Sequence, residues 1–251
     1  MKNIPNLITL ANLFAGCLSV ILIARGFVTE GAVLIVACSL LDFLDGAAAR
    51  WLNAYSAIGK QLDSLADLVS FGFAPAAVLF YYLRNSFDSI NHQGTLFVLS
   101  SAAFLITLCS AVRLARFNLD EKQTDCFTGL PTPANALLIA SLPLTLAFAD
   151  QHTAMHHILS QVTQHSAALL FLTGILSYLL VSPFSMFSLK VRSFSWKGNR
   201  TRVVFLTGCI VLLITFGWGA LPLFLVFYIL LSLIGSFFFP CERNETTSNG
   251  Q

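Results

Sequence analysis

The sequence carries very little charge. Only 10% of its 251 residues are Asp, Glu, Lys or Arg, whereas a typical soluble domain carries about 25%. Hydrophobic residues make up 56% of the chain, and 23 residues are phenylalanine. This composition excludes an ordinary soluble globular domain and predicts an integral membrane protein.

The sequence also lacks any paired cysteine pattern. Its six cysteines form no Cys-x-x-Cys motif, and most of them lie within apolar runs. We interpret them as small buried side chains and not as a disulfide or zinc framework. The basic stretch 190–202 lies between two apolar segments, which favours contact with anionic lipid and predicts no binding of nucleic acid.

The chain has instead a series of apolar runs, each close to the roughly 20 residues that a membrane-spanning helix needs. They predict an all-α, polytopic transmembrane helical bundle with about eight spans. Seven is the competing count, because the seventh run is short and only Gly-Trp-Gly-Ala at 217–220 separates it from the eighth. The predicted spans are 7–24, 31–50, 63–83, 95–117, 133–149, 166–184, 202–217 and 219–239.

Charge asymmetry predicts how these spans are oriented. With eight spans, 12 of the 14 Lys and Arg residues fall on the side of the two termini, and only Arg25 and Arg84 fall on the other side. Loops rich in Lys and Arg face the cytoplasm, so both termini are predicted to be cytoplasmic. The histidine-rich stretch 152–165 then lies on the opposite side, where we expect a short interfacial helix in preference to a zinc site.

Four aspartates stand out in this apolar sequence: Asp42, Asp45, Asp63 and Asp67. The members of each pair are three or four residues apart, so each pair shares one helix face. Residues 51–60 are long enough to turn one helix into an antiparallel neighbour. All four carboxylates can therefore converge on one cleft, and the small residues around them allow close helix approach or leave room for a ligand.

Salt bridges cannot neutralise this cluster, because only Arg50 and Lys60 are nearby. A carboxylate at membrane depth costs about 2.5–3.5 kcal/mol, so protons or cations must compensate. Ligand sets made of oxygen alone favour hard divalent ions such as Mg²⁺ or Mn²⁺. Two functions fit this chemistry: metal-assisted displacement at phosphorus and transport of a divalent cation. The helical spacing argues against a merely solvated acidic loop.

The pattern Asp42-x2-Asp45-Gly46-x2-Ala49-Arg50-x8-Gly59-x3-Asp63-x3-Asp67 resembles the signature of the CDP-alcohol phosphatidyltransferases at every motif position. Members of that family transfer a phosphatidyl or related group from a CDP-linked lipid to an alcohol and release CMP. The resemblance implies that the four aspartates bind Mg²⁺ or Mn²⁺ and that Asp67 is also the general base. It further implies that the CDP-lipid is bound by Gly46, Ala49, Arg50 and Gly59.

Three further stretches resemble the serine-using members of that family: 4–16, 113–118 and 127–136. The resemblance therefore implies CDP-diacylglycerol and L-serine as substrates and a multi-pass enzyme of the bacterial inner membrane. The charge asymmetry alone predicts that its active site faces the cytoplasm. Glycerol 3-phosphate or an inositol compound is the alternative acceptor. The candidate ligands of the acceptor or of a lipid phosphate are Arg113, Arg116, Asn118 and Asn135. The two arginines would equally suit anchors to anionic lipid.

The resemblance covers roughly residues 1 to 140, and the later residues match only in being hydrophobic. We therefore predict a catalytic membrane core at 1–185. A basic cytoplasmic loop and two accessory helices follow at 186–239, where they would serve packing or homodimer contacts. The polar residues 240–251 are predicted to form a disordered tail.

Overall fold

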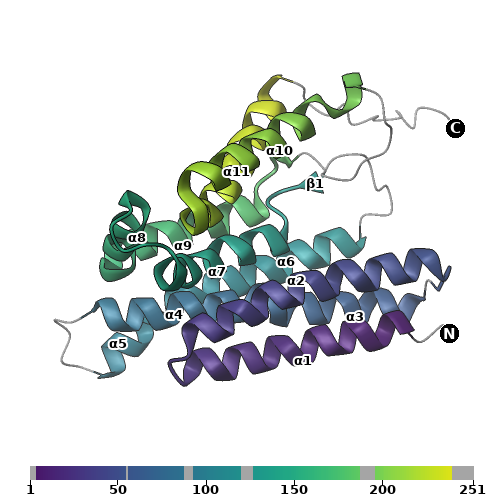
Figure 1. Cartoon of the computed structure of the whole chain (residues 1–251). Coiled ribbons are helices and arrows are strands. Elements are labelled where there is room, and N and C mark those ends of the chain that lie inside the picture. The colour runs from purple at the N-terminus through teal and green to yellow at the C-terminus, as the bar shows by residue number, and fades with distance from the viewer. Residues whose placement is uncertain (1–3, 55, 88–92, 120–126, 187–195, 239–251) are drawn as a thin grey trace, which may run out of the picture.

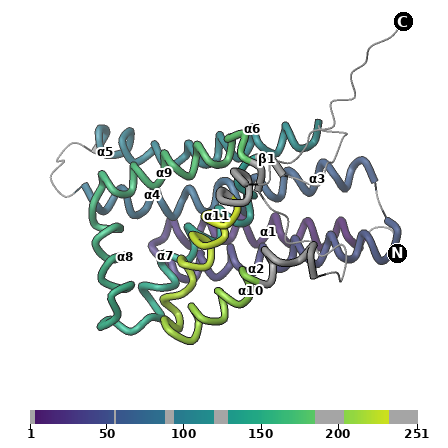
Figure 2. Tube along the Cα trace, turned by 90° about the horizontal axis from the view of Figure 1, so that it is seen from above, coloured from purple at the N-terminus to yellow at the C-terminus, as the bar shows by residue number. Residues whose placement is uncertain are grey.

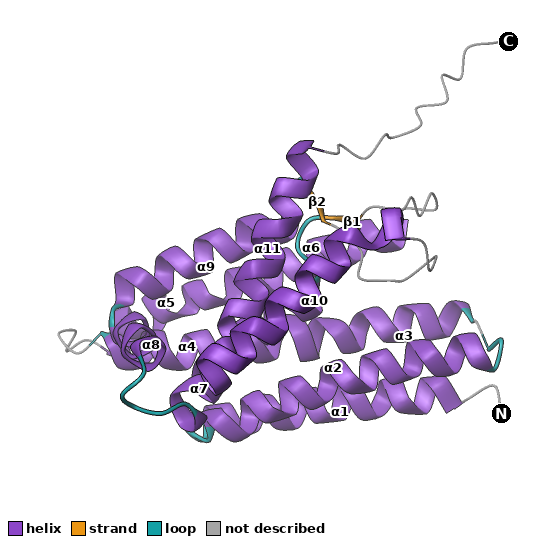
Figure 3. Cartoon of the chain, turned by 45° about the horizontal axis from the view of Figure 1, so that its top comes forward, coloured by secondary structure: helices purple, strands orange, loops and turns teal. Residues whose placement is uncertain are grey.

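The computed structural model describes residues 4–54, 56–87, 93–119, 127–186 and 196–238, so the predicted tail at 240–251 and much of the basic loop lie outside the described residues. Apart from turns and two short strands, the described residues form helices (Figure 3). The predicted all-α class is confirmed. The elements are α1 (Ile4–Ala24), α2 (Val28–Trp51), α3 (Ala57–Asp67), η1 (Leu68–Phe73), α4 (Ala74–Ser86), α5 (Gln93–Ser100), η2 (Ser101–Phe104), α6 (Leu105–Leu119), β1 (Phe127–Thr128), α7 (Thr132–Phe148), α8 (Ala154–Gln164), α9 (Ser166–Val181), β2 (Ser185–Met186), α10 (Trp196–Phe216), η3 (Gly217–Gly219) and α11 (Ala220–Phe238).

The helices form a bundle with α1 and α2 on one side and α10 and α11 on the other (Figure 1). Helices α6, α7 and α9 lie between these two pairs. Seen from above, the N-terminus and the turn between α2 and α3 lie at one end of the bundle, and α8 lies at the other (Figure 2). Asp42 and Asp45 lie in the second half of α2, the half that approaches the end of the bundle where the chain begins.

Helix α1 turns large apolar side chains outward and polar side chains inward. Helix α1 exposes 64% of Leu7 and 65% of Phe14, whereas Thr9 and Asn12 on the same helix are buried. An apolar exterior suits contact with lipid, and polar side chains then turn inward. Among the described residues, five helices are long and apolar enough to cross a membrane, or six if α8 and α9, bent by 93°, count as one span. The protein is therefore a multi-pass membrane protein.

Each predicted span overlaps helices of the structure, and two of them run over several successive elements: 63–83 over α3, η1 and α4, and 95–117 over α5, η2 and α6. Helix α7 has only 17 residues, and residues 204–232 form one long apolar stretch interrupted by η3. That interruption coincides with the turn predicted at 217–220. The count of eight spans and the cytoplasmic position of the termini stay predictions.

Small residues bring α1 close to its neighbours. A Cβ atom at Gly16 would lie 2.5 Å from Oγ of Ser70 and 3.1 Å from its Cα, so any larger side chain would push α1 away from η1. One turn further along α1, the hydroxyl of Ser19 donates a hydrogen bond of 2.7 Å to the carbonyl oxygen of Gly31 on α2. These contacts hold α1 against the two segments that flank the aspartates.

Helix α3 begins at a polar cap and changes its winding just after Asp67. The side chain of Ser56 accepts a hydrogen bond of 2.9 Å from the backbone N–H of Gly59, which satisfies a donor in the first turn. Residues Leu68–Phe73 then form a π-helical turn, η1. Pro75 has no N–H to offer the preceding turn, which favours a departure from α-helical hydrogen bonding. Such π turns are frequent at functional sites, and the apolar pattern of the sequence does not predict this one.

Candidate active site

The four aspartates lie on two successive helices, as the spacing predicts. Asp42 and Asp45 lie on α2, and Asp63 and Asp67 lie on α3, with Asp67 as its last residue. Helix α1 contacts both of these helices. The short segment between Trp51 and Ala57 reverses the chain, so the acidic halves of α2 and α3 run beside α1 from the same end of the bundle.

Three of the four carboxylates come together. One oxygen from each of Asp42, Asp63 and Asp67 lies within 4.8 Å of the other two. Asp67 is 9% exposed, and its Oδ1 has no hydrogen-bond partner among the described residues. Oxygens at these separations fit a hard divalent cation, whose bonds to oxygen are about 2.0–2.6 Å long. The donor set therefore suits the Mg²⁺ or Mn²⁺ that the sequence predicts.

Asp45 lies outside this group of three carboxylates, one helical turn from Asp42. Its Oδ2 accepts a hydrogen bond of 2.7 Å from the hydroxyl of Thr9, which is also 3.0 Å from the carbonyl oxygen of Pro5. Asp45 is only 5% exposed. Thr9 thus belongs to the site, although the sequence analysis did not name it as a site residue. The available signal was its place in the stretch 4–16, which resembles the serine-using members of the family.

The residues predicted to bind the CDP-lipid differ in their surroundings. A Cβ atom at Gly46 would approach only Nη1 of Arg50, at 3.5 Å, so the structure leaves space there. At Gly59 a Cβ atom would lie 3.0 Å from Oδ1 of Asn6, and this glycine allows α3 to approach α1. Ala49 is half-buried and Arg50 is exposed. Of these two glycines, Gly46 is therefore the one at which the described residues leave room for added volume.

Two of the four predicted acceptor ligands, Arg113 and Asn135, lie in the interior. Arg113 on α6 interacts electrostatically with Asp67, and its Nη1 donates to the hydroxyl of Thr132 over 3.4 Å. Its Nε is buried without a hydrogen-bond partner in the described part of the chain. Asn135, one turn after Thr132 on α7, is fully buried, and both polar atoms of its amide are equally unpaired there. Unpaired buried groups of this kind are costly and call for a partner.

The other two, Arg116 and Asn118, have different contacts. Arg116 is exposed and donates to the carbonyl oxygen of Val181 on α9 over 3.4 Å. The side-chain amide of Asn118 donates to the hydroxyl of Ser64 over 2.8 Å, and its backbone carbonyl accepts from Nζ of Lys60 over 3.1 Å. These hydrogen bonds join α6 to α3 and to α9, so both residues take part in contacts between helices.

Two buried polar residues near the aspartates were not assigned a role from the sequence. Asn12 is fully buried, its backbone carbonyl accepts from Ser70 over 3.2 Å, and its side-chain amide has no partner in the described segments. Thr132 is 1% exposed and meets Arg113. Asn12 lies in the stretch 4–16 and Thr132 in the stretch 127–136, and the resemblance of these stretches to the serine-using members of the family was the available signal.

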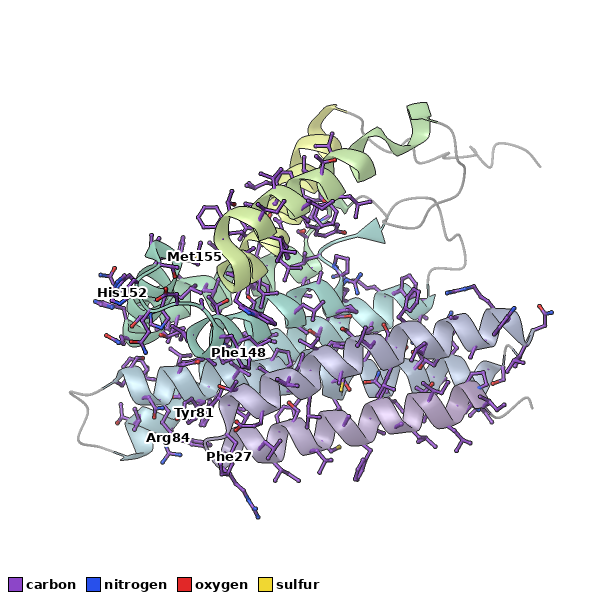
Figure 4. The ribbon with its side chains drawn as sticks, viewed as in Figure 1. Phe27, Tyr81, Arg84, Phe148, His152 and Met155 are labelled. Carbon is purple, nitrogen blue, oxygen red and sulfur yellow. The ribbon has the colours of Figure 1, made fainter. Side chains whose placement is uncertain are left out.

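The histidine-rich stretch lies away from the aspartates. Phe27, Arg84 and His152 lie at the end of the bundle remote from the N-terminus (Figure 4). The predicted short helix is present as α8, which begins at a Thr153 cap. Within the described residues, Asp42, Asp63 and Asp67 are the one group of His, Cys, Asp or Glu side chains that could hold a metal ion.

The sequence profile of the CDP-alcohol phosphatidyltransferases matches residues 2–176, a segment that contains all four aspartates together with Arg113 and Asn135. The chain belongs to this family. The match ends within α9, so α10 and α11 lie beyond it.

Several curated members of the family are similar to this chain. A CDP-diacylglycerol–serine O-phosphatidyltransferase of Helicobacter pylori strain J99 is 36% identical over 137 residues, which is 54% of each chain. The Bacillus subtilis protein of the same name is 32% identical over 145 residues, 58% of this chain and 77% of that one. An archaetidylserine synthase of Methanothermobacter thermautotrophicus is 36% identical over 153 residues, 60% of this chain and 62% of that one. The chain thus spans about half the length of the Helicobacter relative.

Proposed function

We propose that the protein transfers the phosphatidyl group of CDP-diacylglycerol to the hydroxyl of L-serine and releases CMP. The observation that carries this proposal is the group of three carboxylates with a buried arginine beside it: Asp67 interacts with Arg113, whose Nε has no hydrogen-bond partner among the described residues. Membership in the family supports the transfer chemistry. The names of the relatives from Helicobacter pylori and Bacillus subtilis support serine as the acceptor.

In this proposal the metal ions are Mg²⁺ or Mn²⁺, held by Asp42, Asp63 and Asp67, with Asp45 as the fourth ligand. When bound, such ions neutralise negative charge on the pyrophosphate of the CDP-lipid and so favour departure of CMP. Thr9 orients the Asp45 carboxylate through the hydrogen bond of 2.7 Å. The open space at Gly46 takes part of the donor nucleotide, with Ala49 and Gly59 beside it and Arg50 attracting its phosphates.

Serine would bind on the side of Asp67 that faces Arg113. The guanidinium of Arg113 can pair with the serine carboxylate through two parallel hydrogen bonds. The amide of Asn135, which has no partner within the described segments, can orient the serine. Asp67 accepts the proton of the serine hydroxyl as that oxygen bonds to the phosphorus carrying the diacylglycerol. The bond from this phosphorus to the bridging pyrophosphate oxygen breaks, and CMP leaves with the electron pair.

This reaction joins water-soluble substrates to a membrane lipid. Serine and CMP must exchange with water, whereas the acyl chains must remain in the bilayer. We propose that the site faces the cytoplasm of a bacterial inner membrane, because 12 of the 14 Lys and Arg residues fall on the side of the aspartates when eight spans are counted.

The test is CMP release by the purified protein in detergent with CDP-diacylglycerol and Mn²⁺ or Mg²⁺. Parallel reactions contain L-serine, glycerol 3-phosphate or myo-inositol 1-phosphate. Asp67→Asn should lose at least about a hundredfold in rate, the lower bound for removal of a general base. Asp150→Asn is the matched control, because Asp150 is exposed and lies just after α7, outside the acidic group.

Serine-dependent release that disappears in Asp67→Asn would establish both the chemistry and the acceptor. Release with another alcohol would retain the transfer reaction and overturn serine. Absence of release with every acceptor, from folded protein that still binds Mn²⁺, would favour a divalent-cation transporter, which flux of the ion into proteoliposomes would then demonstrate.

A further inference from the structure

The chain changes its helical winding directly after Asp67, and two backbone hydrogen bonds mark the change. The N–H of Leu68 donates to the carbonyl oxygen of Ser64, four residues back, as in an α-helix. The N–H of Ala74 donates to that of Val69, five residues back, as in a π-helix. A turn of this kind contains one more residue than an α-helical turn. It therefore rotates the preceding helix relative to the following one by about 100°, the angle that one residue contributes to an α-helix.

Helix α4, which follows the π turn, is fixed in the core. Its Leu79 and Leu83 are fully buried, so a rotation of α4 would break the packing of the core. An α-helical turn in place of η1 would instead rotate α3, whose C-terminal half carries Asp63 and Asp67. The π turn consequently determines whether these two carboxylates face Asp42 or point away from it.

Two hydrogen bonds to other helices hold the π turn in place. The hydroxyl of Thr107 on α6 donates one of 3.1 Å to the carbonyl oxygen of Gly72 within the turn. The hydroxyl of Ser70 donates one of 3.2 Å to the backbone carbonyl oxygen of Asn12 on α1. Pro75 has no N–H, so the helix itself offers one donor fewer to the carbonyl groups of this turn. Thr107 supplies a donor from outside the helix.

The turn and α6 also fit closely where Thr107 lies. A Cβ atom at Gly72 would lie 3.2 Å from Cβ of Ser110 on α6 and 3.2 Å from Cδ1 of Leu68. Thr107 and Ser110 are three residues apart, so they share one face of α6. This face therefore meets the turn through one hydrogen bond and one close van der Waals contact.

We propose that Thr107 is a positioning residue for the acidic group, because its hydrogen bond to Gly72 stabilises the π turn that directs Asp67 toward Asp42. This inference rests on the proposed function, in which Asp67 binds metal and accepts the proton of serine. Thr107 touches neither metal nor substrate, and its effect is exerted through the winding of the chain. The apparent affinity for a cation falls with the fraction of molecules that keep the competent winding.

The first test compares Thr107→Val with Thr107→Ser. Valine keeps the branched shape and removes the hydroxyl, whereas serine retains the donor. We expect the Kd for Mn²⁺, measured by electron paramagnetic resonance without substrate, to rise roughly two- to tenfold in the valine variant, the range that loss of one hydrogen bond gives. The serine variant should stay close to the wild type. An unchanged Kd in Thr107→Val would overturn the proposal.

The matched control is Thr145→Val. Thr145 donates to the carbonyl oxygen of Trp218 in η3 over 3.5 Å, which is the same kind of contact at the end of α7 opposite Thr132. Both valine variants should unfold at a lower temperature, but only Thr107→Val should bind Mn²⁺ more weakly. Equal losses of Mn²⁺ affinity in the two variants would indicate a merely structural role and would also overturn the proposal.

Hydrogen exchange of the metal-free protein tests the turn itself. Backbone amides of residues 68–77 should exchange roughly two- to tenfold faster in Thr107→Val than in the wild type, because the turn then opens more often. Unchanged exchange would show that Thr107 does not hold the turn, which contradicts the proposal. A wild type that neither binds Mn²⁺ nor releases CMP would overturn the proposed function, and the exchange rates would still decide whether Thr107 holds the turn.

Discussion

Thr9 of α1 donates a hydrogen bond of 2.7 Å to Asp45 of α2, and so the first helix takes part directly in the acidic site. Both side chains are buried, with 4% and 5% of their surface exposed. Replacing Thr9 by valine keeps the shape and removes the donor. We expect Thr9→Val to lower the free energy of unfolding by about 1–3 kcal/mol, because a buried carboxylate oxygen loses its partner.

Thermal unfolding in detergent, read by the fluorescence of a cysteine-reactive dye, would measure this loss. The matched control is Thr9→Ser, which retains the hydroxyl and should stay close to the wild type. A valine variant as stable as the wild type would show that the hydrogen bond between Thr9 and Asp45 contributes nothing.

The group of three carboxylates predicts that the activity depends on a divalent metal ion. Mutation of one of the three should weaken binding of that ion. Asp63→Asn should raise the Mn²⁺ concentration for half-maximal CMP release at least about tenfold. Mutation of a residue that only hydrogen-bonds to a metal ligand already lowers metal affinity by about this factor. EDTA should abolish activity, and added Mn²⁺ or Mg²⁺ should restore it. Electron paramagnetic resonance of bound Mn²⁺ gives a readout without catalysis, and an Asp63→Asn protein with wild-type Mn²⁺ affinity would remove Asp63 from the metal site.

Gly46 and Gly16 should respond differently to the same substitution. Gly46→Ala should leave the unfolding temperature unchanged and raise the KM for CDP-diacylglycerol several-fold, because the added methyl group enters open space beside Arg50. Gly16→Ala should instead destabilise the protein by about 1–3 kcal/mol, since its Cβ would press on Ser70. Unfolding curves and donor titrations of the two variants test this together. The reverse pattern would place the nucleotide elsewhere.

Arg113 and Arg116 should differ although they lie three residues apart. Arg113→Lys should raise the KM for serine about tenfold or more, because the lysine ammonium cannot pair in parallel with a carboxylate. Arg116→Lys should stay within a factor of about three, as expected for an exposed charged group. Initial rates over a range of serine concentrations, at saturating CDP-diacylglycerol, distinguish them. Equal tolerance of lysine at both positions would indicate that the arginines only anchor the protein to lipid.

Much of the site could be predicted from local sequence. Helical periodicity is a local property, so the spacing of Asp42 from Asp45 and of Asp63 from Asp67 predicted one helix face for each pair. The apolar runs predicted the helices that carry them, and the motif predicted the family. The π turn after Asp67 was not predictable in this way, because its register depends on the packing of η1 against α1 and α6.

The sequence by itself therefore determined the class of protein, the helical positions of the aspartates and the chemistry that such ligands favour. Only the tertiary structure decided which polar groups meet. It paired Asp45 with Thr9, Arg113 with Thr132, and Arg116 with the backbone of Val181. Contacts between helices far apart in the chain depend on how whole helix faces pack, and no short stretch of sequence contains that information.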